Sequence, residues 1–156
     1  MAGSAQEAHK KLAVNRRALH DYHVLERLEA GIELVGTEVK SIKAGHITLQ
    51  GSFGRVDHKQ VILHNLNVPT YEFGNQFNHQ PDRPRRLLLH SREILRLHAQ
   101  TQQKGMALIP ISAYLKRGLI KIELGVCRGK QDPDKRESIR RRTAEREAQR
   151  AIAARR

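Results

Sequence analysis

Polar and apolar residues alternate along several short stretches of this chain, and such alternation is typical of β-strands with one buried face. The clearest stretch runs from Tyr22 to Val35, where apolar side chains favour even positions and Ala30-Gly31 allow a bulge or bend. Residues 119–126 alternate in the same way, and 116–118 (KRG) would form the turn before them. Shorter stretches with strand character lie at 47–49, 52–57, 61–66, 87–89 and 106–111.

Two further segments carry the signals of short helices. Thr37 can cap the first, which Gly45 would end, and Ser91 can cap the second, which Gly105 would end. No strand–helix–strand rhythm links these elements, so a parallel sheet is not expected. The pattern predicts a mainly β fold: a small closed antiparallel barrel of about six strands with two or three flanking helices, followed by a basic C-terminal tail.

The stretch 71–90, YEFGNQFNHQPDRPRRLLLH, changes character halfway along. Its first half collects turn-forming and amide residues, and Pro81 and Pro84 disfavour a helix there. Its second half ends in three leucines, of which the middle one, Leu88, should point away from its neighbours, either into the core or toward a ligand. Irregular loops on a rigid scaffold commonly carry binding sites, so this loop is a candidate, although an ordinary solvated loop has a similar composition.

The C-terminal region lacks any such pattern. Residues 128–156 contain eleven Lys or Arg and five Asp or Glu, a net charge of +6, with Ile139 and Ile152 as the large apolar residues. A helix could start at Asp132-Pro133, but it would have no apolar stripe with which to dock. The alternative is a passive solubility tail. We therefore expect three segments: a flexible lead (1–13), a barrel domain (14–130) and a basic tail (131–156) that is disordered when alone.

Lysine and arginine outnumber aspartate and glutamate by 29 to 16, which gives the chain a net charge of +13. The commonest polyanionic partner of such a protein is nucleic acid. Aromatic residues make up only 4%, too few for the stacking platforms of single-strand readers, so we expect folded RNA read by shape and phosphate contacts. A membrane partner is disfavoured because no apolar run is long enough to span a bilayer and no basic amphipathic helix has bulky apolar residues opposite.

Candidate catalytic and metal-binding residues are few. His20 and His79 could act as acid and base in a small ribonuclease, and the spacing of His20 and His23 occurs at metal sites but lacks a strong third ligand. We expect no enzyme, no metal and no cofactor. The single cysteine, Cys127, and an N-terminus without the apolar core of a signal peptide favour a cytoplasmic location.

Taken together, these segments resemble the family of small protein B, the bacterial tmRNA-binding (SsrA-binding) protein. The resemblance extends over residues 14–142 and rests on the number and order of its motifs, each of which is weak alone. The motifs are NRRA (15–18), HDY (20–22), EAG (29–31), GTEVKSI (36–42), YE (71–72), GN (74–75), NH (78–79), RLLLH (86–90), YLK (114–116), GVCRGK (125–130) and DKR (134–136).

The resemblance implies a closed barrel similar to the oligonucleotide-binding fold and a role in trans-translation. Family members bind the tRNA-like part of tmRNA and take it, with elongation factor Tu and GTP, to stalled ribosomes. There the barrel completes the tRNA shape, and the tail folds as a helix in the empty mRNA channel near the decoding centre. We expect a monomer. A basic structural ribosomal protein is the other non-enzymatic alternative.

The resemblance also assigns site residues by motif position. The contacts with tmRNA would come from Asn15, Arg16, Arg17, His20, Glu29, Glu38, Lys40, Gly74, Asn75 and Leu88. The contacts of the tail with the ribosome would come from Arg128, Gly129, Lys130, Asp134, Lys135, Arg136, Arg140 and Arg141. Pro133 departs from the family, which commonly has an aromatic residue or His there that can stack on a base.

Overall fold

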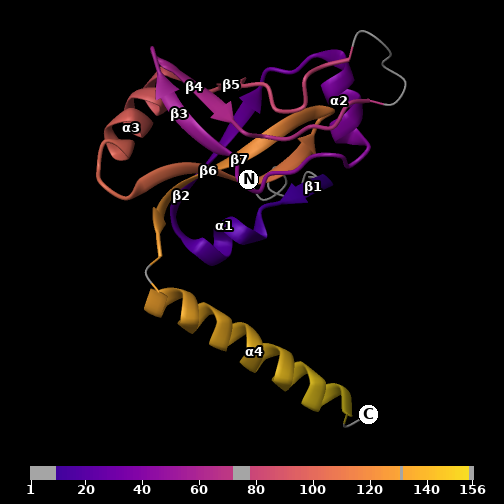
Figure 1. Cartoon of the computed structure of the whole chain (residues 1–156), viewed down its shortest axis with the longest axis vertical. Helices are drawn as coiled ribbons and strands as arrows, with labels where there is room; N and C mark the ends of the chain where they lie inside the picture. The colour runs from indigo at the N-terminus through magenta and orange to yellow at the C-terminus, as the bar shows by residue number, and fades with distance from the viewer. Residues whose placement is uncertain (1–9, 72–77, 131, 155–156) are drawn as a thin grey trace.

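The computed structural model of the chain describes residues 10–71, 78–130 and 132–154. In this part the chain forms seven strands in one antiparallel sheet and four helices (Figure 1). The strands are β1 (Lys10–Val14), β2 (Tyr22–Ile32), β3 (Phe53–Asp57), β4 (Gln60–His64), β5 (Arg85–Leu88), β6 (Met106–Lys116) and β7 (Leu119–Gly129). The helices are α1 (Arg16–Asp21), α2 (Gly36–Lys43), α3 (Ser91–Thr101) and α4 (Asp132–Ala154).

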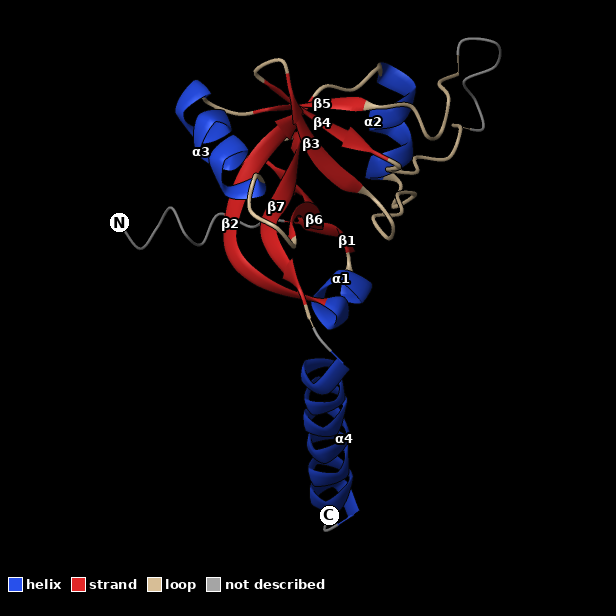
Figure 2. Cartoon of the chain, turned by 60° about the vertical axis from the view of Figure 1, so that its left-hand side comes forward, coloured by secondary structure: helices blue, strands red, loops and turns tan. Residues whose placement is uncertain are grey.

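Six of the strands close into a ring. The strand order is β1-β6-β3-β4-β5-β2-β7, and β7 pairs again with β6, so only β1 lies outside the closed circuit. Figure 2 shows the strands wrapped around a common centre, with α2 and α3 on different sides of them. The expected mainly β, antiparallel fold with flanking helices is therefore confirmed. Where the sequence predicted a closed barrel of about six strands, the structure has a ring of six paired strands.

The longest strands act as the frame of the ring. Along one edge β6 pairs with β3 at Leu108 and with β1 from Ser112 onward, while its other edge pairs with β7. Pro110 lies inside β6, where it cannot donate a ladder hydrogen bond, and the register with β7 shifts between Pro110 and Ser112. This irregularity leaves the carbonyl groups of Pro110 and Ile111 free to accept bonds from Asn15.

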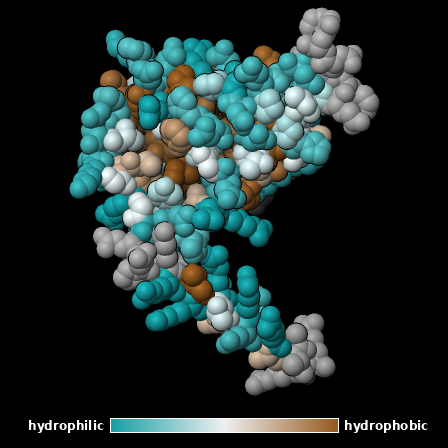
Figure 3. Space-filling view, viewed as in Figure 1, coloured by the Kyte–Doolittle hydropathy of each residue, from teal (hydrophilic) through white to brown (hydrophobic). Residues whose placement is uncertain are grey.

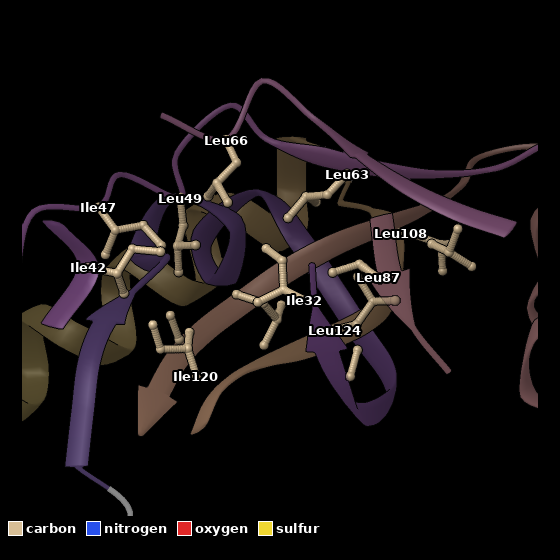
Figure 4. Packing of buried hydrophobic residues seen from close by; sticks show 14 of the residues in the cluster. Ile32, Ile42, Ile47, Leu49, Leu63, Leu66, Leu87, Leu108, Ile120 and Leu124 are labelled. Atoms are coloured by element: carbon tan, nitrogen blue, oxygen red, sulfur yellow. The ribbon is translucent and has the colours of Figure 1, made fainter. Parts of the chain in front are cut away.

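The core of the ring consists of aliphatic side chains from the strands together with residues from the helices and loops. Figure 4 shows leucine and isoleucine side chains from these elements pointing toward one another. In β7 the alternation predicted from sequence is confirmed, because Ile120, Ile122, Leu124 and Val126 are all buried. Ile42 of α2 and Leu97 of α3 are fully buried, so each helix is fastened to the ring by an apolar side chain.

Several boundaries differ from the sequence-based expectation. Residues 10–13, expected in a flexible lead, belong to strand β1, and α1 was not predicted at all. Segment 47–49 is not a strand but makes a single bridge, Thr48 with Asn67. The bulge expected at Ala30-Gly31 lies instead between Val24 and Glu26. An edge strand of five residues and a helix of six are too short to show a clear period.

The helix starts also differ by one or two residues. Helix α2 begins at Gly36 rather than after Thr37, and the backbone N–H of Val35 donates to Glu38 at 2.9 Å. Helix α3 begins at Ser91 itself, and the N–H of His90 donates to Glu93 at 3.0 Å. In both helices a glutamate in the first turn satisfies a backbone donor just before the helix, so a Ser or Thr cap is not needed.

Helix α4 extends away from the ring as a single rod (Figure 1). Its surface is almost entirely hydrophilic in Figure 3, and both Ile139 and Ile152 are exposed. The expectation that this segment has no apolar stripe for docking is confirmed. A helix start near Asp132-Pro133 is confirmed as well, whereas disorder of the isolated tail stays a prediction. No helix among the described residues is long and apolar enough to cross a membrane.

Candidate nucleic-acid interface

The first group of predicted RNA contacts lies on and around α1. Asn15 begins the helix: its carboxamide oxygen accepts from the N–H of Ala18 at 3.1 Å. Its amide nitrogen donates to the carbonyl groups of Pro110 at 3.0 Å and Leu49 at 3.4 Å. The side chain thus joins α1, β6 and the turn after Ile47. Asn15 is only 3% exposed, so it organises this surface from beneath.

The charged side chains of α1 point outward from that anchor. Arg16 is exposed and has no hydrogen-bond partner among the described residues. Arg17 donates to Asp21 at 3.1 Å, and the ring of His20 lies 2.8 Å from the other carboxylate oxygen of Asp21. Such exposed pairs contribute little to stability, so an RNA phosphate can replace Asp21 as the partner of Arg17 at small cost.

Glu29 lies on the outer face of β2 and is held by two residues of β6. The hydroxyl of Tyr114 donates to its carboxylate, and Lys116 lies 3.3 Å away. The hydrogen bond from Tyr114 lowers the pKa of Glu29, although its partial burial acts in the opposite direction. Burial, and then the negative charge of Glu29, raise the pKa of Tyr114 above its usual value. Glu29 is therefore an ionised acceptor whose carboxylate is held in place.

For Leu88, the middle leucine, the structure excludes one of the two alternatives, a position in the core. Leu87 is buried, whereas Leu88 is 49% exposed and points outward from β5. It lies against Gly31 of β2: a Cβ atom on that glycine would come within 3.2 Å of the Leu88 Cβ. The two residues, with Val39 and Lys121, line a shallow hollow of about 220 Å³ on the outside of the ring. An exposed leucine beside a lysine suits an apolar contact with RNA.

Lys40 and Glu38 lie close together on α2, but Lys40 is exposed and Glu38 is buried. Lys40 is exposed, and its ammonium lies 5.6 Å from the centre of the Tyr71 ring. Glu38 is fully buried and forms ion pairs with Arg83, just before β5, and with Arg85, the first residue of β5. No part of the Glu38 carboxylate reaches the surface in this structure, and a direct contact of Glu38 with RNA stays a prediction.

Arg85 completes this cluster inside the protein. Its guanidinium is buried and also donates to the carbonyl groups of Leu66 at 2.8 Å, Arg83 at 3.0 Å and Pro81 at 3.0 Å. Burial alone would raise the pKa of Glu38, but the hydrogen bonds from Arg83, Val35 and Arg85 lower it overall. An ionised pair of this kind, with its remaining donors satisfied, holds α2 and the loop before β5 in one arrangement.

Asn15 is buried as well, and its predicted direct contact with RNA likewise stays a prediction. Gly74 and Asn75 lie outside the described residues. The structure brings Glu29 and Leu88 to one side of the ring, around Gly31, and places Arg16, Arg17 and His20 together on α1. Figures 1 and 2 show α1 and α2 at separate ends of the ring, so the predicted contacts form two groups rather than one patch.

The predicted ribosome contacts begin inside the ring domain. Arg128 and Gly129 are the last residues of β7, and both are exposed. Lys130 is fastened to the end of α1: its backbone N–H donates to Asp21 at 2.8 Å and its ammonium lies 3.4 Å from the carbonyl of Leu19. The root of the tail is thus attached to the helix that carries Arg16 and Arg17.

The remaining predicted tail contacts are part of α4. Asp134 and Lys135 lie in its first turn, followed by Arg136, Arg140 and Arg141, all three exposed. Exposed arginines on a helix that lacks an apolar face suit contacts with an external polyanion.

The geometry does not support the enzymatic alternative. His79 is held between the hydroxyl of Thr37 at 2.8 Å and the carbonyl of Val68 at 2.7 Å, next to α2, whereas His20 lies on α1 at the other end of the ring. The described residues contain no cluster of three potential metal ligands. Cys127 is buried, and the loss of solvation raises its pKa to about 11, so it is not a reactive thiol.

Comparison with known proteins identifies the family. The model of the SmpB protein family matches residues 12–154. This chain belongs to the SmpB protein family. The SsrA-binding protein of Carboxydothermus hydrogenoformans is 51% identical over 146 residues, which are 94% of this chain and 98% of that protein. The SsrA-binding protein of Pelotomaculum thermopropionicum is 54% identical over 143 residues, 92% of this chain and 94% of its own.

A solved SmpB-family structure supports the same relationship. It is described as "tmRNA-SmpB: a journey to the center of the bacterial ribosome" and superposes with a TM-score of 0.67 at 46% sequence identity. The match covers 83% of this chain and 94% of the other.

Three residues of this surface escaped the sequence analysis. Arg83 and Arg85 precede the RLLLH motif, and nothing in the sequence showed that they reach α2. Tyr114 was quoted only as part of a motif, yet it positions Glu29 from β6, which lies on the other side of β7 from β2. A buried carboxylate needs a cationic partner, but Glu38 stands between Thr37 and Val39, and this local sequence does not mark it as buried.

Proposed function

We propose that this member of the SmpB family binds the tRNA-like domain of tmRNA and delivers it to ribosomes stalled without a stop codon. The observation that carries the proposal is the match to the family over residues 12–154, which includes both the ring and α4. The family is one of RNA-binding proteins, and its function does not require an active site in this chain.

The six-stranded ring supports the RNA-binding half of this function. We infer that it serves as a closed barrel similar to the oligonucleotide-binding fold, with the exposed cations of α1 and α2 on phosphates and Leu88 on an apolar part of the RNA. Glu29 would accept hydrogen bonds from base amino groups. Gly74 and Asn75 belong to the same proposed surface. Asn15 and Glu38 support it from within the fold.

We propose that α4 makes the contacts with the ribosome. Its exposed arginines, and the absence of any apolar side with which to pack on the ring, suit a helix that lies along ribosomal RNA. We propose that α4 occupies the empty mRNA channel near the decoding centre and is fully ordered only there. Arg128, Gly129, Lys130, Asp134, Lys135, Arg136, Arg140 and Arg141 would make its contacts.

The cellular setting follows from the same proposal. Elongation factor Tu with GTP would join indirectly, through aminoacylated tmRNA, and the chain would act as a monomer in the cytoplasm. No metal or organic cofactor enters the proposed function.

A binding titration tests the proposal. Full-length protein is titrated into the tRNA-like domain of tmRNA and, as the matched control, into an elongator tRNA of similar length and charge. We expect clear preference for the tRNA-like domain at physiological salt, because shape rather than charge distinguishes the two RNAs. Equal affinity for both would reduce the chain to a general basic RNA binder and would contradict the proposal.

A further inference from the structure

The turn at 48–51 lies beside α1, and neither the sequence nor the resemblance assigned it a role. Gly51, with φ of +84°, reverses the chain here, and its left-handed backbone is one that side chains rarely permit. Ser52 closes the turn by donating from its N–H to the carbonyl of Leu49 at 3.0 Å. The same carbonyl accepts from the amide of Asn15 at 3.4 Å, so the turn is fixed against the start of α1.

This arrangement leaves two shallow hollows between the turn and α1. Their volumes are about 320 and 230 Å³, and both are lined by Asn15, Arg17 and Gln50. Tyr22 lines the larger hollow and Arg16 the smaller. Arg17 and Gln50 therefore lie between the two hollows, both of which open to the surface.

The side chain of Gln50 is available to a ligand. Gln50 is exposed, and among the described residues its carboxamide has no hydrogen-bond partner. Its backbone is nevertheless held still, because Leu49 and Ser52 on either side of the Gln50-Gly51 pair are buried. A neutral amide on a rigid support, flanked by an arginine and a tyrosine, is a suitable set for recognising a nucleotide by its polar groups.

We propose that Gln50 is a further RNA contact of this protein, and that one ribonucleotide of the bound RNA seats in these hollows. The inference rests on the proposed function and extends it. Arg16 and Arg17 would meet the phosphate, while the sugar would lie near Tyr22. The carboxamide of Gln50 can donate and accept together, as can a ribose 2′-hydroxyl, so this hydroxyl is the group that Gln50 would bind.

The proposal predicts a signature that separates Gln50 from the arginines. Loss of a neutral hydrogen bond should weaken binding by a constant factor at every salt concentration, because no counterion is released. Loss of a phosphate contact should instead reduce the dependence of affinity on salt. Gln50→Ala and Arg17→Ala therefore differ in kind and not only in size.

The experiment uses the full-length protein and the tRNA-like domain of tmRNA. Gln50→Ala is compared with Gln60→Ala, an exposed glutamine at the start of β4 that the proposal places outside the interface. We expect Gln50→Ala to bind about three- to tenfold more weakly with an unchanged salt slope, and Gln60→Ala to bind like the wild type. Thermal unfolding should be unchanged for both, since each side chain is exposed.

Single 2′-deoxy substitutions along the RNA then identify the partner group. At one nucleotide the deoxy substitution should weaken the wild type but leave Gln50→Ala unaffected, which is the mark of a direct pair in a double-mutant cycle. Wild-type affinity in Gln50→Ala, a changed salt slope, or the absence of such a nucleotide would overturn the inference. If the wild type itself shows no preference for the tRNA-like domain, the proposed function fails, and the inference falls with it.

Discussion

The ring and helix α4 present cationic side chains in opposite ways. In the ring, surface residues stand on buried polar supports: Asn15 joins α1 to two other segments, and Glu38 joins α2 to the loop before β5. The described side chains of α4 are all exposed, among them Ile139 and Ile152 at 51% and 63%. The ring residues that we propose as RNA contacts thus lie on surfaces held in place by the fold, whereas α4 lacks an apolar stripe with which to pack on the ring.

The largest expected effect comes from removing the charge beneath α2. In Glu38→Gln the buried guanidinium of Arg85 loses its ionic partner, so the free energy of unfolding should fall by about 3–5 kcal/mol. Urea denaturation measures it. The matched control is Glu33→Gln, which breaks the exposed pair with Arg86 and should cost no more than about 1 kcal/mol. Similar losses for the two variants would show that the buried ion pairs of Glu38 stabilise the fold no more than an exposed ion pair does.

Acid should weaken the same cluster. The pKa of Glu38 in the folded protein lies below its unfolded value of 4.5, so its contribution to stability is fully present above pH 4.5. That contribution is lost as the pH falls from 4.5 through the lower folded pKa, because the unfolded state then binds the proton more readily. The unfolding free energy of Glu38→Gln should depend less steeply on pH over this interval than that of the wild type. Parallel curves would contradict the assignment.

A smaller loss of stability is expected at the support beneath α1. Asn15→Ala removes the helix cap, leaves the carbonyl of Pro110 without its side-chain donor and removes one donor from the carbonyl of Leu49, which should cost about 1–3 kcal/mol. Asn67→Ala, which removes an exposed hydrogen bond to Asp82, is the control and should have little effect. Chemical denaturation of both variants measures the difference. An equally small loss in Asn15→Ala would show that the contacts of its carboxamide are dispensable.

The exposed cations should affect binding rather than stability. Arg16→Ala and Lys40→Ala should each lower the salt dependence of binding to the tRNA-like domain by about 0.9 in the slope of log K against log salt. Arg92→Ala, an exposed arginine of α3 outside the proposed surface, is the control. A slope equal to that of the wild type would exclude the substituted residue from the interface.

The sequence predicted the elements that a periodic pattern or a terminating glycine marks. The alternation over β2 and β7 and the glycines after α2 and α3 are local signals, and they were sufficient for a mainly β architecture with flanking helices. The short elements β1 and α1 were missed because they depend on pairing with β6 and on the carboxamide of Asn15. Their stability comes from contacts with residues about 95 positions away, which no local pattern contains.

The site was harder to predict than the fold for a related reason. Motif position identifies Glu38 and Lys40 equally well, yet one side chain is buried and the other exposed. Glu38 can be buried because it pairs with Arg83 and Arg85, which lie far from it in the sequence. A motif therefore marks the surface that we propose for RNA binding but does not separate its exposed residues from the buried residues that hold it in place.

The most direct test of the division between ring and α4 is a truncation with two readouts. Full-length protein and residues 1–130 are compared for binding to the tRNA-like domain of tmRNA and for rescue of stalled ribosomes. We expect equal preference for the tRNA-like domain in both and no rescue by the truncated chain. Loss of that preference on truncation, or rescue that survives it, would contradict the account.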